Sequence, residues 1–248
     1  MSAGPDADKG VARLRSLHRR RPGEGALVLP GPWDAASAQI FADAGFEALA
    51  TPSHGVSASL GNADGETPAD EMFAAVARIV RAVEVPVTAD IERGYGLPPK
   101  QIVERLRECG AVGCNLEDSQ EGALVDPRLQ ADFLAEVVAA AGGEIFLNAR
   151  VDSYVHSAAD PLADALVRGR LYVEAGAECV YPIGAPPGDI GVLARELKVP
   201  VNALSPAGGP TPGELGAAGA ARVTFGGGLA QRAMAAVKEM AEELRHGG

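Results

Sequence analysis

The sequence contains few aromatic residues, cysteines and histidines. Aromatic residues make up 4% of its 248 residues, and there are three cysteines and four histidines. Three is an odd number, and the spacing of Cys109, Cys114 and Cys179 fits neither a zinc site nor a disulfide framework. We therefore expect buried reduced thiols, in a core built mainly from alanine, valine, leucine and glycine.

Positive charge and long apolar runs are also scarce. The formal net charge is −11, which disfavours nucleic acid and anionic membranes as partners. No apolar run approaches the roughly 20 residues that a membrane span requires, and the first residues lack the charged and then apolar pattern of a secretory signal. These absences predict a cytoplasmic protein with no nucleic-acid partner and no membrane partner.

Short apolar runs alternate with helical patterns through the rest of the sequence. Eight runs are typical of buried parallel strands, and a helical pattern follows each of them. Strict alternation predicts parallel pairing with right-handed crossovers. The predicted strands are 27–30, 47–51, 85–90, 112–117, 144–150, 178–182, 199–203 and 222–225, and the predicted helices are 35–44, 68–83, 99–109, 128–141, 162–175, 190–197, 211–218 and 229–244.

Eight repeats predict an α/β fold, a single (β/α)8 barrel of the TIM type that forms one domain over residues 1–248. Residues 7–20 have the pattern of an extra amphipathic helix within an N-terminal extension, residues 1–25, and we expect this helix to close the bottom of the barrel. A doubly wound open sheet is the structural alternative. That fold usually carries a glycine-rich phosphate turn after its first strand, whereas this chain has Gly31-Pro32-Trp33-Asp34 there.

Acidic residues and one arginine follow several of the predicted strands. Asp90 and Glu92 end the third strand, Glu117 ends the fourth and Arg150 ends the fifth, while Asp64 lies beyond the second. Because the carboxyl ends of barrel strands converge on one mouth, these side chains should lie close together. Oxygen ligands without nearby histidine or cysteine favour Mg²⁺ or Mn²⁺ over zinc.

A metal ion at this mouth would leave positions for substrate oxygens, so a 2-oxo or 2-hydroxy acid could chelate it. Arg150 offers a planar fork for a second carboxylate or a phosphonate. The alternative for this arginine is an internal ion pair with a neighbouring carboxylate. Ser53, with the backbone amides of His54 and Gly55, could form a small anion-binding nest.

Several ordered motifs resemble those of the isocitrate lyase and phosphoenolpyruvate mutase superfamily. The resemblance runs from about residue 27 to about residue 225 and implies a (β/α)8 barrel with Mg²⁺ at its mouth. It also implies chemistry on 2-oxo acids and their enolates, in a homo-oligomer that is a dimer or a tetramer. The motifs are, in order, PGPWDAASA, SHGVSASLG with the following Asp64, ADIERGYG, LEDS and NARVD.

The resemblance implies a role for each matching position. Asp90 would be the principal metal-side acid, and Glu92 stands where many members of the superfamily have aspartate. Asp64 and Glu117 would hold metal-bound waters or complete the shell of ligands, and Arg150 would bind a substrate carboxylate or phosphonate. Because glutamate is one methylene longer than aspartate, Glu92 is expected to bind through water or to shift the ion.

The same resemblance assigns the substrate side of the mouth. Ser53 and the amides of His54 and Gly55 would bind the pyruvyl end of the substrate. Trp33, from the first motif, and Asn202, at the end of the seventh predicted strand, are further candidates for substrate binding.

The segment after Asp118 departs from the superfamily pattern. Isocitrate and methylisocitrate lyases of the superfamily carry a Cys-Gly-His signature there, and its phosphonomutases and phosphonopyruvate hydrolases carry lysine, threonine and asparagine. Residues 119–127, with the sequence SQEGALVDP, contain no cysteine, histidine, lysine, threonine or asparagine. The chain therefore looks like a short phosphonomutase-like member that lacks the Cys-Gly-His loop.

This departure leaves the proton donor open. By position, the candidates are His54, Tyr95, Glu121 and Asp126, and a metal-bound water is another.

Three functions are compatible with these residues. The leading hypothesis is a Mg²⁺-dependent lyase that cleaves or forms a carbon–carbon bond next to a 2-oxo or 2-hydroxy carboxylate through a metal-stabilised enolate, with Arg150 and Glu117 among its catalytic residues. Its substrate would be a small di- or tricarboxylate or a 2-oxo acid, such as an oxaloacetate-like or 2-methylmalate-like acid. The alternatives are a carbon–phosphorus mutase or phosphonopyruvate hydrolase, including carboxyphosphonoenolpyruvate-type chemistry, and a catalytically idle barrel that binds a 2-oxo acid.

Overall fold

A computed structural model describes residues 7–19, 24–156 and 158–246. Parts of the expected N-terminal extension, residues 1–25, and the predicted helix end at Arg20 lie outside the described residues. Within them, eight parallel strands occur at the eight predicted places. They are β1 (Leu27–Val28), β2 (Leu49–Thr51), β3 (Val87–Asp90), β4 (Gly113–Glu117), β7 (Phe146–Val151), β8 (Cys179–Pro182), β9 (Asn202–Leu204) and β10 (Arg222–Thr224).

These strands form a ring. Strands β2, β3, β4, β7 and β8 are hydrogen-bonded in that order, and β1, β10 and β9 form a second run. A bridge between Val180 and Val201 joins β8 to β9. On the other side, the Ala50 amide donates to the Pro30 carbonyl across 3.1 Å and joins β2 to the end of β1. The parallel, sequential order confirms the predicted (β/α)8 architecture.

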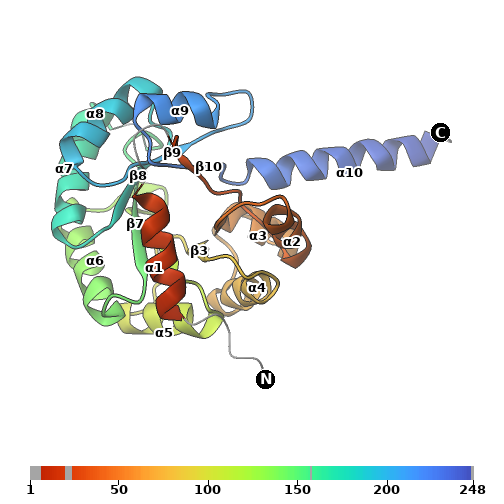
Figure 1. Ribbon diagram of the computed structural model, residues 1–248, viewed down its shortest axis with the longest axis horizontal. Coiled ribbons are helices and arrows are strands. Elements are labelled where there is room, and N and C mark those ends of the chain that lie inside the picture. The colour runs from red at the N-terminus through yellow and green to blue at the C-terminus, as the bar shows by residue number, and fades with distance from the viewer. Residues whose placement is uncertain (1–6, 20–23, 157, 247–248) are drawn as a thin grey trace.

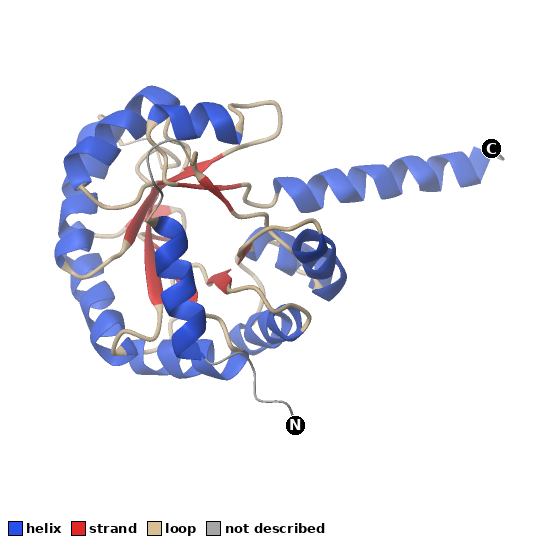
Figure 2. Ribbon diagram, viewed as in Figure 1, coloured by secondary structure: helices blue, strands red, loops and turns tan. Residues whose placement is uncertain are grey.

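Helices surround the ring on its outer side (Figure 2). Proline opens α5, α6, α7, α8 and α9, where its missing N–H costs no hydrogen bond. No helix among the described residues has the length and hydropathy needed to cross a bilayer. The helices that follow the strands are α2 (Ala35–Asp43), α4 (Ala69–Arg81), α5 (Pro99–Cys109), α6 (Pro127–Ala141), α7 (Pro161–Glu174), α8 (Pro187–Leu197), α9 (Pro212–Ala218) and α10 (Gly228–His246).

An extra helix, α1 (Ala7–His18), lies across one end of the ring (Figure 1). Val11 and Leu14 are buried in a cluster with Leu27 and Phe146, which begin strands β1 and β7. Strands begin at the bottom of such a barrel, so α1 closes the bottom, as predicted. The apolar seal leaves the opposite end of the ring for polar groups.

Two elements were not predicted from the sequence. A helix, α3 (Ser53–Leu60), begins two residues after β2, where we expected an irregular anion-binding nest. A hairpin formed by β5 (Ser119–Gln120) and β6 (Ala123–Leu124) occupies the departing segment. Its two central residues, Glu121 and Gly122, have φ of 52° and 77°, as a tight type I′ turn requires.

The last helix, α10, does not pack on the ring. It projects away from the barrel along most of its length (Figure 1). Ala230, in its first turn, is its one buried residue among those described. Met234, Val237, Met240 and Leu244 are at least half exposed and recur every three or four residues, so α10 carries an uncovered apolar stripe.

Candidate active site

A cavity of about 320 Å³ opens at the carboxyl ends of the strands. The predicted convergence of strand ends is seen here, because β3, β4, β7, β8 and β10 all contribute polar side chains. The polar and charged lining residues are Thr51, Ser53, His54, Asp64, Asp90, Asn115, Arg150, Tyr181, Thr224 and Gln231.

A second cavity, of about 530 Å³, adjoins the first on the side of the acidic loops. Glu92, Tyr95 and Glu117 line it, and Asp64 lines both cavities. The four acids expected around the metal are therefore divided between two neighbouring spaces. Asp90 faces the first, Glu92 and Glu117 face the second, and Asp64 lies between them.

The turn after β3 has an unusual backbone conformation that places Glu92 and Tyr95 beside the second cavity. Glu92 and Tyr95 have positive φ values of 52° and 57°, which non-glycine residues rarely adopt and which cost free energy. Gly94 also has positive φ, and a Cβ there would lie 2.5 Å from Cδ1 of Ile102. The strained turn thus directs Glu92 toward the acidic cavity while it packs on α5.

Arg150 connects the acids at the centre of the site. Its Nη1 atom lies 2.7 Å from Oε2 of Glu117, and its Nε lies 2.7 Å from Oδ1 of Asp152. Burial alone would lower the pKa of Arg150, but Asp90, Asp152 and Glu117 raise it, so the guanidinium stays charged. The internal ion pair considered from the sequence is therefore present, and Arg150 also lines the first cavity.

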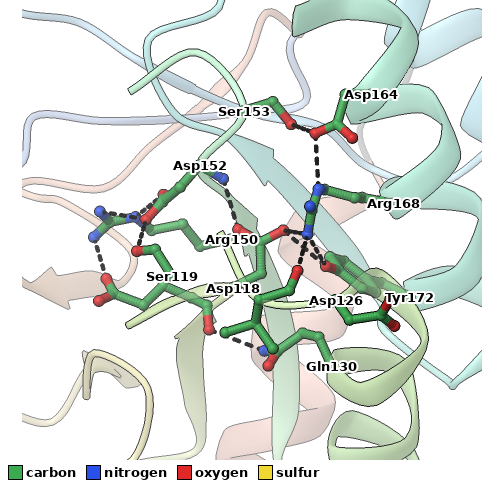
Figure 3. A network of polar contacts seen from close by, with 12 residues as sticks. Asp118, Ser119, Asp126, Gln130, Arg150, Asp152, Ser153, Asp164, Arg168 and Tyr172 are labelled. Carbon is green, nitrogen blue, oxygen red and sulfur yellow. Dashed lines mark hydrogen bonds and ion pairs between the residues drawn. The ribbon is translucent and has the colours of Figure 1, made fainter. Parts of the chain in front are cut away.

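A buried network behind Arg150 holds it in place (Figure 3). The Asp152 amide donates to Asp118 across 2.8 Å, and Asp118 also accepts from the Tyr172 hydroxyl (2.7 Å) and from Arg168 (3.1 Å). Asp118 and Asp152 are fully buried. Because α7 carries Arg168 and Tyr172, this helix indirectly fixes the arginine that faces the cavity.

The carboxylates at the mouth outnumber the cations that face them. Burial raises the pKa of Asp90, although Arg150 and the hydroxyl of Ser53 oppose the shift. Burial, followed by the charges of Asp90 and Asp64, raises the pKa of Glu92 to about 7. Burial also raises the pKa of Glu117 to about 8, against the effect of Arg150. One guanidinium does not compensate this group of acids.

The donor set fits a hard divalent cation. Oε1 of Glu92 is buried and has no hydrogen-bond partner among the described residues, which is a costly state for a carboxylate. Among the described residues, no group of three or more histidine, cysteine, aspartate or glutamate side chains is placed so that it could hold a metal ion. Mg²⁺ usually takes one or two protein carboxylates and keeps several waters, a demand that Asp90 and Glu92 are sufficient to meet.

The residues of the expected anion nest form the first turn of α3. Ser53, His54 and Gly55 are its first three residues, after Pro52 as the N-cap, which caps no amide with its side chain. Free amides and the helix dipole make such a terminus suitable for a carboxylate. The Ser53 hydroxyl donates to Asp90 across 3.2 Å, which ties this terminus to the acidic side.

The candidates for proton transfer have different environments. Nδ1 of His54 lies 3.5 Å from Asp64, and the amide of Gln231 donates to its Nε2 across 3.2 Å, so both ring nitrogens are engaged. The Tyr95 hydroxyl is buried and has no hydrogen-bond partner among the residues that the structure describes. Asp126 caps α6 by accepting two backbone amides, and Glu121 lies in the hairpin turn beside the second cavity.

Three predicted substrate-binding residues, Trp33, Gly55 and Asn202, do not line the cavity. Trp33 packs edge-on against Phe41, and its carbonyl accepts a hydrogen bond from Ser59. Asn202 is fully buried and exchanges hydrogen bonds with Thr224. Asn202 therefore lies behind the cavity and holds Thr224, which lines it.

Sequence reasoning missed the cavity floor around Asn115. Oδ1 of Asn115 accepts from Asn148 (2.7 Å) and from Arg222 (3.4 Å), and Asn115 lines the cavity. Arg222 is fully buried, and burial lowers its pKa. Its Nε and Nη1 have no partner among the described residues. The signal in the sequence was three polar residues at inward positions of their strands.

Known proteins resemble this chain over nearly all of the barrel. The sequence model of the family described as "Phosphoenolpyruvate phosphomutase" matches residues 14–245. An uncharacterised protein of Mycobacterium tuberculosis is 37% identical over 203 residues, which cover 81% of this chain and 77% of that protein. A 2-methylisocitrate lyase of Aeropyrum pernix is 29% identical over 214 residues, 80% of this chain and 67% of that enzyme.

A solved structure also resembles this chain over nearly its whole length. A Burkholderia cenocepacia protein provisionally named a phosphonomutase superposes with a TM-score of 0.85 at 37% identity, covering 98% of this chain and 100% of that one. The similarity thus includes the strand ends that line the cavity.

Proposed function

Because the chain belongs to the isocitrate lyase and phosphoenolpyruvate mutase superfamily, we propose that it is a Mg²⁺- or Mn²⁺-dependent lyase. It would cleave or form a carbon–carbon bond next to a 2-oxo or 2-hydroxy carboxylate. Membership alone is compatible with either a lyase or a mutase. The choice between them rests on the site.

One observation carries the proposal. A cavity lined by Asp90, the start of α3 and Arg150 adjoins a group of acids that includes Glu92, whose buried Oε1 has no partner among the described residues. These are an oxygen donor set and a carboxylate-binding cation side by side, which is what a chelating 2-oxo acid needs.

Different residues of the site would bind the metal ion and the substrate. Asp90 and Glu92 would hold the ion, with Asp64 and Glu117 binding its waters. A bound Mg²⁺ or Mn²⁺ would place positive charge beside the oxygen on which an enolate develops its negative charge. Arg150, fixed by its acidic neighbours, would orient the substrate carboxylate.

The first turn of α3 would bind the pyruvyl end through its free amides. We assign proton transfer to Tyr95, because its hydroxyl has no partner among the described residues, whereas both ring nitrogens of His54 are engaged. Tyr95→Phe should then lower kcat by roughly 100-fold with little change in KM, a split that steady-state kinetics measures.

Pyruvate release from a panel of oxaloacetate, 2-methylmalate and related acids, with and without Mg²⁺, tests the proposal. Arg150→Lys should lower kcat/KM by roughly 100-fold or more. Lysine lacks the planar guanidinium that Glu117 and Asp152 hold in place in the wild type. Arg107→Lys is the matched control, since Arg107 pairs with Glu144 on the outer surface. No turnover of any member with Mg²⁺ present would refute the lyase.

A carbon–phosphorus mutase or hydrolase is the second candidate. The description of the matching family and the name of the Burkholderia protein favour it. Phosphorus NMR of phosphonopyruvate incubated with the protein and Mg²⁺ discriminates, because only this reaction moves the phosphorus signal. Mg²⁺-dependent binding of oxalate in calorimetry, with no turnover in either assay, would instead favour an idle barrel.

We also propose that the protein is a homo-oligomer in which α10 packs on a second copy. The supporting observation is the apolar stripe of Met234, Val237, Met240 and Leu244 on a helix that leaves its own barrel (Figure 1). An isolated, largely exposed helix of this kind gains little from propensity alone and needs a packing partner.

A further inference from the structure

Three polar side chains meet inside the barrel beneath the cavity. Asn115 on β4, Asn148 on β7 and Arg222 on β10 are all buried, and we call them the polar cluster. Arg222 bonds to Asn115 although β10 and β4 are not neighbours in the ring, so these side chains point inward. Branched apolar side chains usually fill the interior of such barrels, so a buried cation at this place requires an explanation.

The polar cluster is incompletely paired. Within the part of the chain that the structure describes, Nε and Nη1 of Arg222 and Oδ1 of Asn148 are buried and have no hydrogen-bond partner. Polar atoms in this state cost free energy of folding. The stability of the fold therefore does not account for the cluster.

Asn115 connects the polar cluster to the cavity. It lines the cavity and pairs in register with Asp90 on the neighbouring strand β3, so it lies beside an acid that we propose as a metal ligand. Its Oδ1 accepts from both other members of the cluster. With this oxygen occupied twice, the side chain of Asn115 has its amide N–H groups to offer a ligand.

The charge of Arg222 acts on the same part of the cavity. Burial lowers the pKa of Arg222, and Asp90 is among the groups that oppose this shift, so the two charges interact. A guanidinium remains protonated even where burial disfavours its charge. Because the protein interior screens charges less than water does, this fixed cation favours negative charge on a ligand at the cavity floor.

We propose that Arg222 is a positioning residue for enolate formation and that it acts through Asn115. This inference rests on the proposed function and adds a residue to it. When a carbon–carbon bond next to a 2-oxo group breaks, its electron pair enters the adjacent carbonyl, and the carbonyl oxygen takes up the negative charge. In oxaloacetate the fourth carbon leaves as CO₂, and the third carbon then takes the proton that the proposed function assigns to Tyr95.

The Asn115 amide, held and polarised by Arg222, donates a hydrogen bond to this oxygen. The carbonyl oxygen of the intact substrate carries less negative charge than the enolate oxygen. The arrangement therefore stabilises the enolate more than the bound substrate, which is what lowers the barrier.

Two ligands of nearly the same shape test the inference. Oxalate carries negative charge where the enolate oxygen would lie, whereas oxamate has an uncharged amide group at that end. In calorimetric titrations with Mg²⁺, Arg222→Met should weaken the binding of oxalate roughly 10-fold and that of oxamate by less than about 2-fold. Arg222→Lys, which keeps the charge, should restore most of the preference for oxalate. Arg78→Met, on the outer helix α4, should change neither affinity.

Equal weakening of oxalate and oxamate in Arg222→Met would mean that the residue only maintains the shape of the cavity, and the inference would be overturned. The route through Asn115 has its own test. In Asn115→Leu the donor is absent, so the further change Arg222→Met should alter oxalate affinity by less than about 2-fold. An undiminished loss in the double variant would overturn the role of Asn115.

Titration of the wild type separates this inference from the proposed function. If oxalate fails to bind in Mg²⁺, the proposed function is wrong and the inference falls with it. If oxalate binds to the wild type and equally well to Arg222→Met, only the role of Arg222 is overturned.

Discussion

Arg222 is the largest fully buried side chain of the described residues, and no carboxylate pairs with it. An unpaired buried charge is expensive, and apolar replacement of such groups is often neutral or stabilising. Within the part of the chain that the structure describes, its one side-chain hydrogen bond goes to Asn115, on the floor of the cavity. At the scale of residues, this suggests that Arg222 serves binding at the expense of stability.

We predict that Arg222→Met leaves the free energy of unfolding unchanged or raises it by about 1–2 kcal/mol. The same change should weaken Mg²⁺-dependent oxalate binding roughly 10-fold, because the Asn115 amide loses one of the two groups that orient it. Denaturant unfolding and calorimetry measure the two effects, with Arg78→Met on the outer helix α4 as the control. Strong destabilisation with unaltered oxalate affinity would show that Arg222 is purely structural.

The three cysteines should be chemically inert in the folded protein. Burial raises the pKa of Cys109 to about 11 and the pKa values of Cys114 and Cys179 to about 12. Since the thiolate is the reactive form, raising the pH from 7 to 9 leaves nearly all of these thiols protonated. The expected buried, reduced thiols are confirmed.

A chromogenic disulfide reagent should therefore detect almost no thiol in the native protein at pH 8 and three per chain in guanidinium chloride. Activity should also survive the reagent. Rapid reaction of one thiol at pH 8, with loss of activity, would mean that a cysteine is accessible and could act as the missing acid or base.

At the scale of elements, local sequence patterns were sufficient to predict the helices and strands wherever long-range packing favoured the same structure. Each predicted strand and each helix that follows a strand is present, because period, caps and prolines all favour the same assignment. Segments 53–60 and 119–124 were missed for different reasons. The first is a serine-rich run with weak helical amphipathicity, stabilised by its place over β3 and α4. The second is a hairpin whose turn needs positive φ at Glu121, a residue that gives no local signal for it.

The exposed stripe of α10 leads to a prediction about assembly. Met234→Lys combined with Met240→Lys should convert the oligomer to monomers, because each lysine would have to be desolvated against the partner copy. Analytical ultracentrifugation over a range of concentrations measures this. The matched control is Lys238→Ala with Glu239→Ala, which changes α10 beside the stripe. A wild-type protein that is already monomeric at micromolar concentration would contradict the proposal.

At the scale of the whole molecule, the acids of the site were predictable and their supports were not. Asp90, Glu92 and Glu117 end strands, and the barrel geometry brings strand ends together whatever the details. Asp118 and Arg168, in contrast, are 50 residues apart in the chain, and only the docking of α7 on the sheet makes them partners.

We expect the surplus of acids at the mouth to make the stability of the protein depend on divalent cations. The chain has a net charge of −11, and its most closely placed acids surround one guanidinium. A ligand that binds only the folded state stabilises it by about 2.7 kcal/mol at 100 times its Kd, which for a chain of this size raises Tm by roughly 5–10 °C.

Saturating Mg²⁺ should therefore raise Tm in differential scanning calorimetry well beyond the effect of NaCl at equal ionic strength. In Asp90→Asn, the metal-free protein should be at least as stable as the wild type, because a buried and poorly compensated carboxylate has been removed, while the Mg²⁺ effect should be lost. Glu104→Gln, at an exposed acid on the outer helix α5 paired with Lys100, should keep the full Mg²⁺ effect. If Mg²⁺ and NaCl raise Tm equally, or if Asp90→Asn retains the difference, the acids at the mouth do not form the metal site.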